Sequence, residues 1–311
     1  MEAVSLFSGC GGSDLGLHAN GFSMLMANDI LPKAAETYRH NLPDTDFRLG
    51  DVSLIKNFPK AQLLVGCYPC QGFSQGGARQ TDRSINFLYR EFDRALRQIK
   101  PKAFIVENVS GMTHSNYSHL LNNQIRRFRS AGYLVNYSVL NAANYGVAQE
   151  RRRIFIVGIR SDFGIRYEFP APTHGPNALN PYVSQADAIG HLPAWPVGKF
   201  WEENFHWYYM SRDRRREWNL PSKTIVSNAR HMPLYPGSPA LEKVQEDEWR
   251  FSSNEPARRL SFEEAQLLQG FPQTFIFPET VGLRDRYKVI GNAVPPPLFA
   301  AVSGALPPIW D

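Results

Sequence analysis

Short apolar runs alternate with segments of helical period along the first half of the chain, and this alternation limits the possible folds most strongly. Six runs are apolar and β-prone: 4–7, 24–26, 63–65, 104–106, 134–140 and 154–157. Between them, the clearest helical pattern places apolar residues from Ile85 to Ile99 in steps of three and four, and Lys100-Pro101 ends it. Strands that alternate with helices predict an α/β fold with a doubly wound, mostly parallel sheet.

The sequence pattern changes near Phe169, where prolines become frequent and the regular alternation of strand-like and helix-like segments stops. Aromatic residues crowd the following stretch, and regularity returns near Arg258. There Ser261 and Glu264 have the spacing of a capping box ahead of a helical pattern, and Gly270 is a stop signal. We therefore expect a first domain over residues 1–169, a second, smaller inserted lobe over 170–257, and a return to the first domain over 258–311.

A cysteine and a carboxylate follow two of the apolar runs. Cys70 lies in Pro69-Cys70-Gln71, shortly after the run that ends at Val65, and Glu107 comes directly after the run that ends at Val106. The carboxyl ends of parallel strands share one edge of a sheet, where open α/β sheets bind ligands. The two side chains could therefore share one cleft, as nucleophile and proton donor. The alternative is a buried structural cysteine and an ordinary surface glutamate.

A glycine-rich turn follows the first apolar run and predicts a ligand site. Gly9, Gly11 and Gly12 let the backbone turn tightly and approach a ligand that a Cβ would exclude. Asp29 stands 20 residues after Gly9, at the end of the second run, where an acidic residue typically accepts both ribose hydroxyls of a nucleotide. The full G-x-G-x-x-G spacing is missing, so a purely structural turn stays an alternative.

Five ordered segments together resemble the cytosine-C5 DNA methyltransferases of bacterial restriction-modification systems. They are Leu6–Gly16, Val65–Ser74, Glu107–Val109, Asn144–Arg153 and Gly291–Pro295. The resemblance covers nearly the whole chain and leaves only a central stretch of about 85 residues divergent, where function-specific loops are expected. It implies an S-adenosylmethionine-dependent, Rossmann-like methyltransferase fold in which the inserted lobe recognises the target.

The resemblance also implies the cofactor, S-adenosyl-L-methionine, and the positions that line its pocket. These positions are Phe7, Ser8, Gly9, Gly11, Gly12, Asp29, Ile30, Asp51, Val52, Pro69, Leu88, Asn292, Ala293 and Val294. Ile30 could pack on the adenine, and Asp51 could accept a hydrogen bond from its exocyclic amine. Phe7 and Leu88 are core residues instead if the resemblance misleads. We expect no metal ion.

The chemistry implied by the resemblance assigns roles to five residues. The Cys70 thiolate adds to cytosine C6 and makes C5 nucleophilic, Glu107 donates a proton at N3, and Asn108 orients the loop. Arg153 donates to cytosine O2, and Arg151 lies near the same site or a phosphate. Attack on C6 comes from above the ring, so the cytosine must be flipped out of the duplex.

Two segments are expected to contact DNA. The small, polar stretch after the cysteine looks suited to move over the site, and Gln71, Ser74, Arg79 and Arg83 are its candidate contacts. In the inserted lobe, residues 210–233 are similar to the subgroup that methylates GGCC-type sites. Arg212, Arg214 and Arg230 occupy the matching positions, where arginine forks can grip guanine or bind phosphate.

Bulk properties agree with a DNA-associated enzyme. The 311-residue chain carries a net charge of +5, which suits double-stranded DNA as a partner. Its three cysteines do not resemble a disulfide framework, and neither a leader nor a membrane-spanning apolar stretch is visible, so we expect a cytoplasmic protein. The resemblance suggests a monomer, and leaves open a cognate restriction endonuclease acting on the same site.

Three other functions compete with this interpretation. The transfer-RNA cytosine-5 methyltransferases of the same family carry Cys-Phe-Thr in the target lobe, and that tripeptide does not occur here. A catalytically silent DNA-binding module would not need Cys70 and Glu107 intact. A nicotinamide-dependent oxidoreductase shares the glycine turn and the acid, but it has no use for that thiol and carboxyl together.

Overall fold

The computed structural model describes residues 1–69 and 88–310. Within them, clustering of spatial neighbours gives two compact units. The first unit comprises residues 1–141, 152–171 and 298–311, and the second comprises 142–151 and 172–297. These compact units do not test the predicted functional boundaries at 169/170 and 257/258, which stay predictions.

The first unit contains a seven-stranded sheet in the order β3-β2-β1-β4-β5-β7-β6. Its strands are β1 (Glu2–Leu6), β2 (Ser23–Asp29), β3 (Asp46–Leu49), β4 (Leu63–Gly66), β5 (Ala103–Val109), β6 (Tyr133–Asn141) and β7 (Arg152–Arg160). The pairs among β3, β2, β1, β4 and β5 are parallel, whereas β7 runs antiparallel to both of its neighbours. The predicted α/β fold with a mostly parallel sheet is confirmed.

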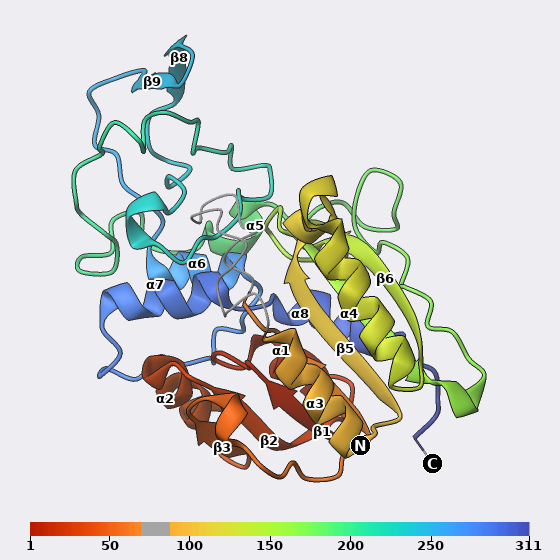
Figure 1. The fold of residues 1–311 in the computed structure, drawn as a ribbon. Coiled ribbons are helices and arrows are strands. Elements are labelled where there is room, and N and C mark those ends of the chain that lie inside the picture. Colours follow the sequence, from red (N-terminus) through yellow and green to blue (C-terminus); the bar gives the residue numbers. More distant parts are fainter. Residues whose placement is uncertain (70–87, 311) are drawn as a thin grey trace. The chain divides into compact units, whose positions relative to one another are not determined.

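Helices cover both faces of this sheet. They are α1 (Gly12–His18), α2 (Pro32–Asn41), α3 (Tyr89–Ile99), α4 (Ser118–Ser130) and most of α8 (Pro296–Gly304). Figure 1 shows α3 and α4 side by side along one face, where Phe92, Phe104 and Phe128 pack edge to face with ring centroids 5.0–5.8 Å apart. On the other face, Phe299 of α8 packs against Phe155 of β7. These aromatic layers fix the strand ends that carry the candidate site.

Small residues let the helices approach the sheet closely next to the site. A Cβ at Gly66, the last residue of β4, would lie 2.4 Å from the ring of Phe92 on α3. Gly66 precedes Cys67-Tyr68-Pro69, so the α3 contact anchors the chain just before residues 70–87, which lie outside the described part. The described part of the predicted 85–99 helix is confirmed as α3.

The second unit has little regular structure. Its elements are α5 (Gln185–Ile189), α6 (Phe262–Leu268), α7 (Leu283–Asn292) and a small hairpin of β8 (Leu241–Gln245) and β9 (Glu248–Phe251). The predicted capping box of Ser261 and Glu264 is present at the start of α6. No helix among residues 1–69 and 88–310 is long and apolar enough to cross a membrane.

Candidate active site

Glu107 and Arg153 form an ion pair at the carboxyl end of β5. The antiparallel register places Glu107 opposite Phe155 and Val109 opposite Arg153, so Glu107 and Arg153 are diagonal neighbours on one face. Arg153 Nε lies 3.0 Å from Glu107 Oε1, and the two side chains are 16% and 10% exposed. Burial lowers the pKa of the Arg153 guanidinium, and the Glu107 carboxylate opposes this shift. The structure thus brings together the two groups predicted to contact cytosine N3 and O2, whose roles stay predictions.

Asn108 connects this strand end to the loop that carries the predicted nucleophile. Its buried amide donates from Nδ2 to the carbonyl oxygen of Tyr68 at 3.0 Å, and its Oδ1 accepts from the Val109 amide at 2.8 Å. Tyr68 is itself fixed by a hydrogen bond from its hydroxyl to Gln124. Asn108 therefore holds the main chain two residues before Cys70 beside Glu107. Cys70 and the predicted DNA contacts Gln71, Ser74, Arg79 and Arg83 lie outside the described residues.

The two described cysteines are poor nucleophiles. Cys10 is fully buried, and burial raises the pKa of its thiol. Burial also raises the pKa of the Cys67 thiol, and the nearby carboxylate of Glu107 raises it further. A nucleophilic cysteine needs a thiolate, which is favoured by an electropositive and partly exposed setting. Both thiols suit structural roles.

The glycine-rich turn between β1 and α1 has the strained backbone of a ligand site. Gly9 and Gly11 have φ values of +56° and +93°, and the non-glycine Phe7 has a φ of +59°. A Cβ at Gly11 would lie 2.8 Å from a side-chain carbon of Leu42, whereas at Gly9 it would meet no atom of residues 1–69 and 88–310 within 4 Å. The turn is therefore closed on the side of α2 and open at Gly9.

Asp29 ties this turn to the end of β2. Its carboxylate accepts hydrogen bonds from the Gly9 amide at 2.8 Å and from the Leu31 amide at 2.9 Å. A carboxylate at the end of the second strand of such a sheet is placed to accept from ribose hydroxyls. Ile30 follows with its side chain 64% exposed, as a flat apolar contact for a base requires. This donor and acceptor set fits the nucleoside part of the predicted cofactor.

The other predicted cofactor residues of the first unit differ in what their side chains can do. Asp51 is exposed and accepts from the Ser53 amide, whereas Val52 is buried in the core and presents only its main chain. Ser8 is buried and donates to the Asn28 carbonyl. Phe7 and Leu88 are partly buried and pack against the core, Pro69 is exposed, and Gly12 begins α1.

Asp14, which the sequence did not predict as a site residue, helps to hold the glycine-rich turn. It is fully buried on α1 and accepts from the hydroxyls of Ser5, Ser13 and Tyr38 at 2.7–2.9 Å. Burial raises the pKa of its carboxyl, which the three hydroxyl donors offset in part. The sequence did contain a signal for this role. An acidic residue two positions after Gly12, next to a buried turn, needs several hydrogen-bond donors.

Gln149 and Arg151 form a buried hydrogen-bonded hub in the second unit. Arg151 donates to the main-chain carbonyls of Ile225, Gly291 and Ala293 at 2.9–3.0 Å. Gln149 accepts from the Ile225 amide and donates to Gln269, which donates in turn to the Ala293 carbonyl. The predicted catalytic role of Arg151 stays a prediction; the observed bonds hold the main chain. The predicted cofactor residues Asn292, Ala293 and Val294 lie at the end of α7 and just after it, beside this hub.

Replacing Gly291 with alanine is expected to destabilise the protein. A Cβ at this position would lie 2.2–2.3 Å from main-chain atoms of Val226 and Ser227, which cannot rotate away. We expect a loss of roughly 2 kcal/mol or more in the free energy of unfolding, measured by denaturant titration. Gly282→Ala is the matched control, because its added Cβ meets open space at an ordinary backbone conformation. Equal stability of the two variants would contradict this prediction.

The three predicted DNA-reading arginines differ in their surroundings. Arg214 donates to the carbonyls of Tyr209 and His231, lies 4.7 Å over the ring of Tyr209, and has its guanidinium pKa lowered by burial. Arg230 forms an ion pair with Glu203. Arg212 is exposed above the ring of Tyr208, and among the described residues it makes no ion pair. Their DNA contacts stay predictions, but the three guanidinia are not equally available.

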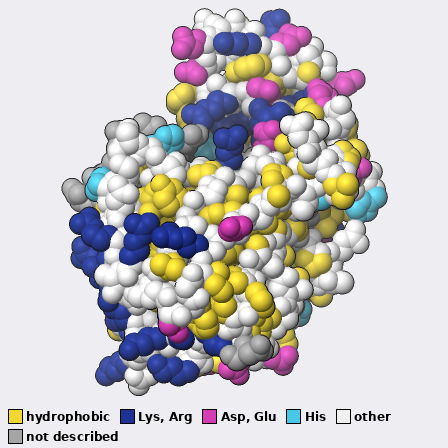
Figure 2. Space-filling model, turned by 90° about the vertical axis from the view of Figure 1, so that its right-hand side faces the viewer, with side chains coloured by type: hydrophobic (Ala, Val, Ile, Leu, Met, Phe, Trp, Pro, Cys, Tyr) yellow, Lys and Arg dark blue, Asp and Glu magenta, His cyan; other side chains and the backbone are white. Residues whose placement is uncertain are grey.

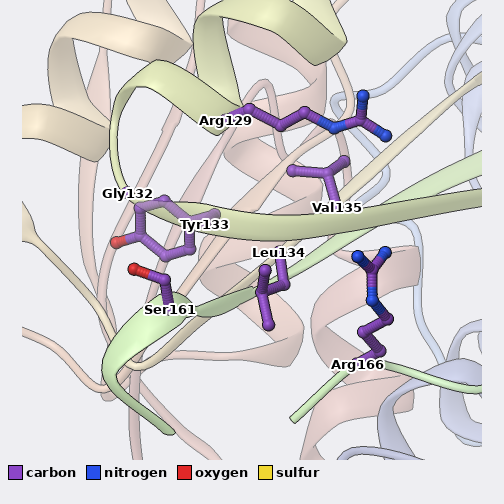
Figure 3. Close-up of a pocket in the computed structure, with 7 residues that line it drawn as sticks. All are labelled: Arg129, Gly132, Tyr133, Leu134, Val135, Ser161 and Arg166. Atoms are coloured by element: carbon purple, nitrogen blue, oxygen red, sulfur yellow. The ribbon is translucent and has the colours of Figure 1, made fainter. Parts of the chain in front are cut away.

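A cavity of about 460 Å³ lies elsewhere in the first unit (Figure 3). It is lined by Arg129, Gly132, Tyr133, Leu134, Val135, Ser161 and Arg166. These residues surround the start of β6 and the end of β7, which is the sheet edge opposite to Glu107. The cavity is therefore separate from the predicted site. On one face of the molecule, the Lys and Arg side chains gather in groups (Figure 2).

The fold is that of an α/β methyltransferase. It is similar to the crystal structure of a prophage-encoded protein from E. coli described as a DNA modification methyltransferase, with a TM-score of 0.74 and 22% identity over 98% of both chains. It is also similar to the Dnmt2 methyltransferase of S. pombe, with a TM-score of 0.71 and 16% identity over 97% of this chain and 96% of the other.

The sequence identifies the family. The family model of C-5 cytosine-specific DNA methylases matches residues 1–307, and the chain belongs to this family. It is 37% identical to the type II methyltransferase M.BsuRI of Bacillus subtilis, over 98% of this chain and 79% of that protein. It is 34% identical to M.NgoPII of Neisseria gonorrhoeae, over 98% of this chain and 95% of the relative. The protein is a DNA cytosine-5 methyltransferase of the restriction-modification type, as predicted.

Proposed function

We propose that this enzyme flips a cytosine out of a GC-rich duplex site and methylates its C5 through a covalent bond between Cys70 and C6. The observation that carries the proposal is the buried pair of Glu107 and Arg153, which Asn108 joins to the main chain just before Cys70. This arrangement offers a proton donor and a cation to the polar edge of one pyrimidine. Neither a structural glutamate nor a silent DNA-binding module requires it.

The proposed mechanism uses the chain's residues in turn. The Cys70 sulfur forms a bond to C6, and the ring electrons displaced toward N3 are neutralised by the proton of Glu107. Arg153 donates to O2 and stabilises the same developing charge. After methylation, loss of the C5 proton to a water or weak base restores the ring double bond and releases the Cys70 sulfur, and the N3 proton returns to the Glu107 carboxylate.

The ion pair must open for this chemistry. While Arg153 contacts Glu107, its positive charge favours the carboxylate form, which has no proton to donate. A guanidinium that donates to cytosine O2 holds the carboxylate less closely, and the bound base excludes water from the pocket. Both changes favour the protonated carboxyl when N3 needs a donor.

The proposed methyl donor is S-adenosyl-L-methionine, which supplies an electrophilic methyl group when bound. Asp29 would accept from the ribose hydroxyls, the exposed side chain of Ile30 would contact the adenine, and Asp51 would accept from the adenine amine. The support is the backbone at Gly9, where a Cβ would meet no atom of residues 1–69 and 88–310 within 4 Å, together with the Asp29 carboxylate beside it. Residues 292–294 are proposed as further contacts.

For the target we propose a GGCC-like site. Arg212 and Arg230 have half-exposed or exposed guanidinia on one side of the second unit and suit guanine O6 and N7. We further propose that the enzyme acts as a monomer in the prokaryotic cytosol, beside a restriction endonuclease for the same site.

Bisulfite sequencing of plasmid DNA from cells that express the chain tests this function. We expect unconverted cytosines at one inner position of GGCC sites, and full conversion in cells with the empty vector. Protection in another sequence context would refute the target and keep the activity. No protected cytosine, from a protein shown to be folded and expressed, would refute the proposed function itself.

A further inference from the structure

The guanidinium of Arg230 is held by the carboxylate of Glu203. Arg230 Nε donates to Glu203 Oε2 at 2.6 Å, and a second bond joins Nη2 to Oε1, so the contact has two prongs. The indole of Trp201 also donates to Glu203 Oε2 at 2.9 Å. These hydrogen bonds from Arg230 and Trp201 lower the pKa of the Glu203 carboxyl. The side chains of Arg230 and Glu203 are nevertheless 53% and 38% exposed, so a ligand can reach them.

The main chains on both sides of this ion pair are fixed by one buried residue. The guanidinium of Arg259 donates to the carbonyls of Arg230 at 3.0 Å, of Glu203, and of Trp201 at 3.3 Å. It also lies over the rings of Phe205 and Tyr209, 4.5 and 4.7 Å from their centroids. The segments that carry Arg230 and Glu203 thus stay in place while their exposed side chains can exchange partners.

A carboxylate and the major-groove edge of guanine present the same pattern to arginine. Each offers two acceptors in one plane, which a guanidinium fork grips with two parallel hydrogen bonds. A guanine can therefore replace both bonds that Arg230 makes to Glu203. At a position without guanine, Arg230 either keeps its two hydrogen bonds to Glu203 or makes fewer bonds to the base.

We propose that Glu203 holds Arg230 until a guanine replaces it, and thereby sets the free-energy cost of reading that base. This inference rests on the proposed reading of guanine by Arg230. Neighbouring cations are held similarly, since Arg215, Arg216 and Lys223 pair with Glu217, Glu150 and Asp213. Such pairing lowers the attraction of this surface for phosphate at random sequences, which is the main source of non-specific binding.

The test compares Glu203→Gln with Glu202→Gln. Both variants remove one negative charge from adjacent exposed positions, and among the described residues Glu202 makes no ion pair. Glutamine at 203 can still accept the Trp201 bond, so folding is not at risk. Affinities are measured by fluorescence anisotropy for a duplex with the methylated site and for a duplex with its guanines replaced.

We expect Glu203→Gln to tighten binding to the site by about two- to fivefold, because the wild-type chain must break this exposed ion pair before Arg230 can bind guanine. Binding to the duplex without the site should tighten less, because there Arg230 can keep Glu203 as its partner, so the ratio of the two affinities rises. Glu202→Gln should change both affinities alike. In an Arg230→Ala background, Glu203→Gln should no longer alter the ratio, because the two residues act as a pair.

The outcomes separate this inference from the function on which it rests. A specificity ratio unchanged by Glu203→Gln, or raised equally by Glu202→Gln, would overturn the role of Glu203. If Arg230→Ala alone leaves the ratio unchanged, the proposed guanine reading fails first, and the role of Glu203 fails with it. Methylation by the wild-type chain in the bisulfite assay is independent of both results.

Discussion

Cys70→Ala is expected to abolish methyl transfer while DNA binding stays measurable. Without the bond to C6, the C5 atom of cytosine is a poor nucleophile, so we expect turnover to fall by roughly four orders of magnitude or more. The neighbouring thiols cannot substitute, since burial raises the pKa of both Cys10 and Cys67. Turnover is measured by transfer of a labelled methyl group to duplex DNA, and binding by anisotropy.

A trapping experiment assigns the nucleophile directly. DNA that carries 5-fluorocytosine at the target position cannot lose the C5 substituent as a cation, so the wild-type enzyme should remain covalently attached. Cys70→Ala should form no adduct, whereas the control Cys67→Ala should still form one. An adduct in Cys70→Ala, or one that maps to Cys10 or Cys67, would contradict the mechanism.

All six runs that the sequence predicted became strands. The apolar runs of β4 and β5 are buried on both faces, whereas β6 at the sheet edge is partly exposed and alternates, with Asn136 and Ser138 between apolar residues. The strand of this sheet that was missed, β3, is at the other edge, pairs only with β2, and has a single buried residue, Phe47. An edge strand exposed along most of its length leaves little periodic signal in the sequence.

The sequence supplied the candidate site residues but not the pairing between them. Glu107 was predicted from its place after an apolar run, which depends only on local sequence, and Asn108 beside it from the family resemblance. The ion pair of Glu107 with Arg153 depends on β7 being antiparallel to β5, and strand direction leaves no trace in an apolar run. Residues 151 and 153, two apart in one motif, therefore have different partners, Arg151 in a buried hub and Arg153 beside the acid.

The sequence also could not show which arginine side chains are available to bind DNA. Arg212 and Arg214 look equivalent in the arginine-rich stretch, yet only Arg214 has its guanidinium bound to two main-chain carbonyls. The sequence assigned no role to Arg258 and Arg259, although both are almost fully buried. Arg258 pairs with Glu264 of the predicted capping box, and a buried pair of this kind becomes visible only in the folded chain.

Glu107→Gln is expected to lower turnover by roughly two to four orders of magnitude, the contribution of a positioned general acid. Glutamine has the same size and can still accept a hydrogen bond from Arg153, so the strand end should keep its structure. It cannot transfer a proton to N3, and the charge that develops on the ring stays uncompensated. Single-turnover methylation of a duplex substrate measures the effect on the chemical step.

Two comparisons decide whether the carboxyl acts chemically or only supports the fold. S-adenosylmethionine affinity, measured by calorimetry, should hardly change in Glu107→Gln, because Asp29 and Ile30 at the end of a different strand are the proposed cofactor contacts. Glu107→Asp keeps the acid but withdraws it from Arg153, and should retain more turnover than Glu107→Gln. A general acid gives this order, since the proton can still be delivered from a poorer position. Near-wild-type turnover in Glu107→Gln would remove Glu107 from the mechanism, and equal losses in the two variants would assign it a purely structural role beside Arg153.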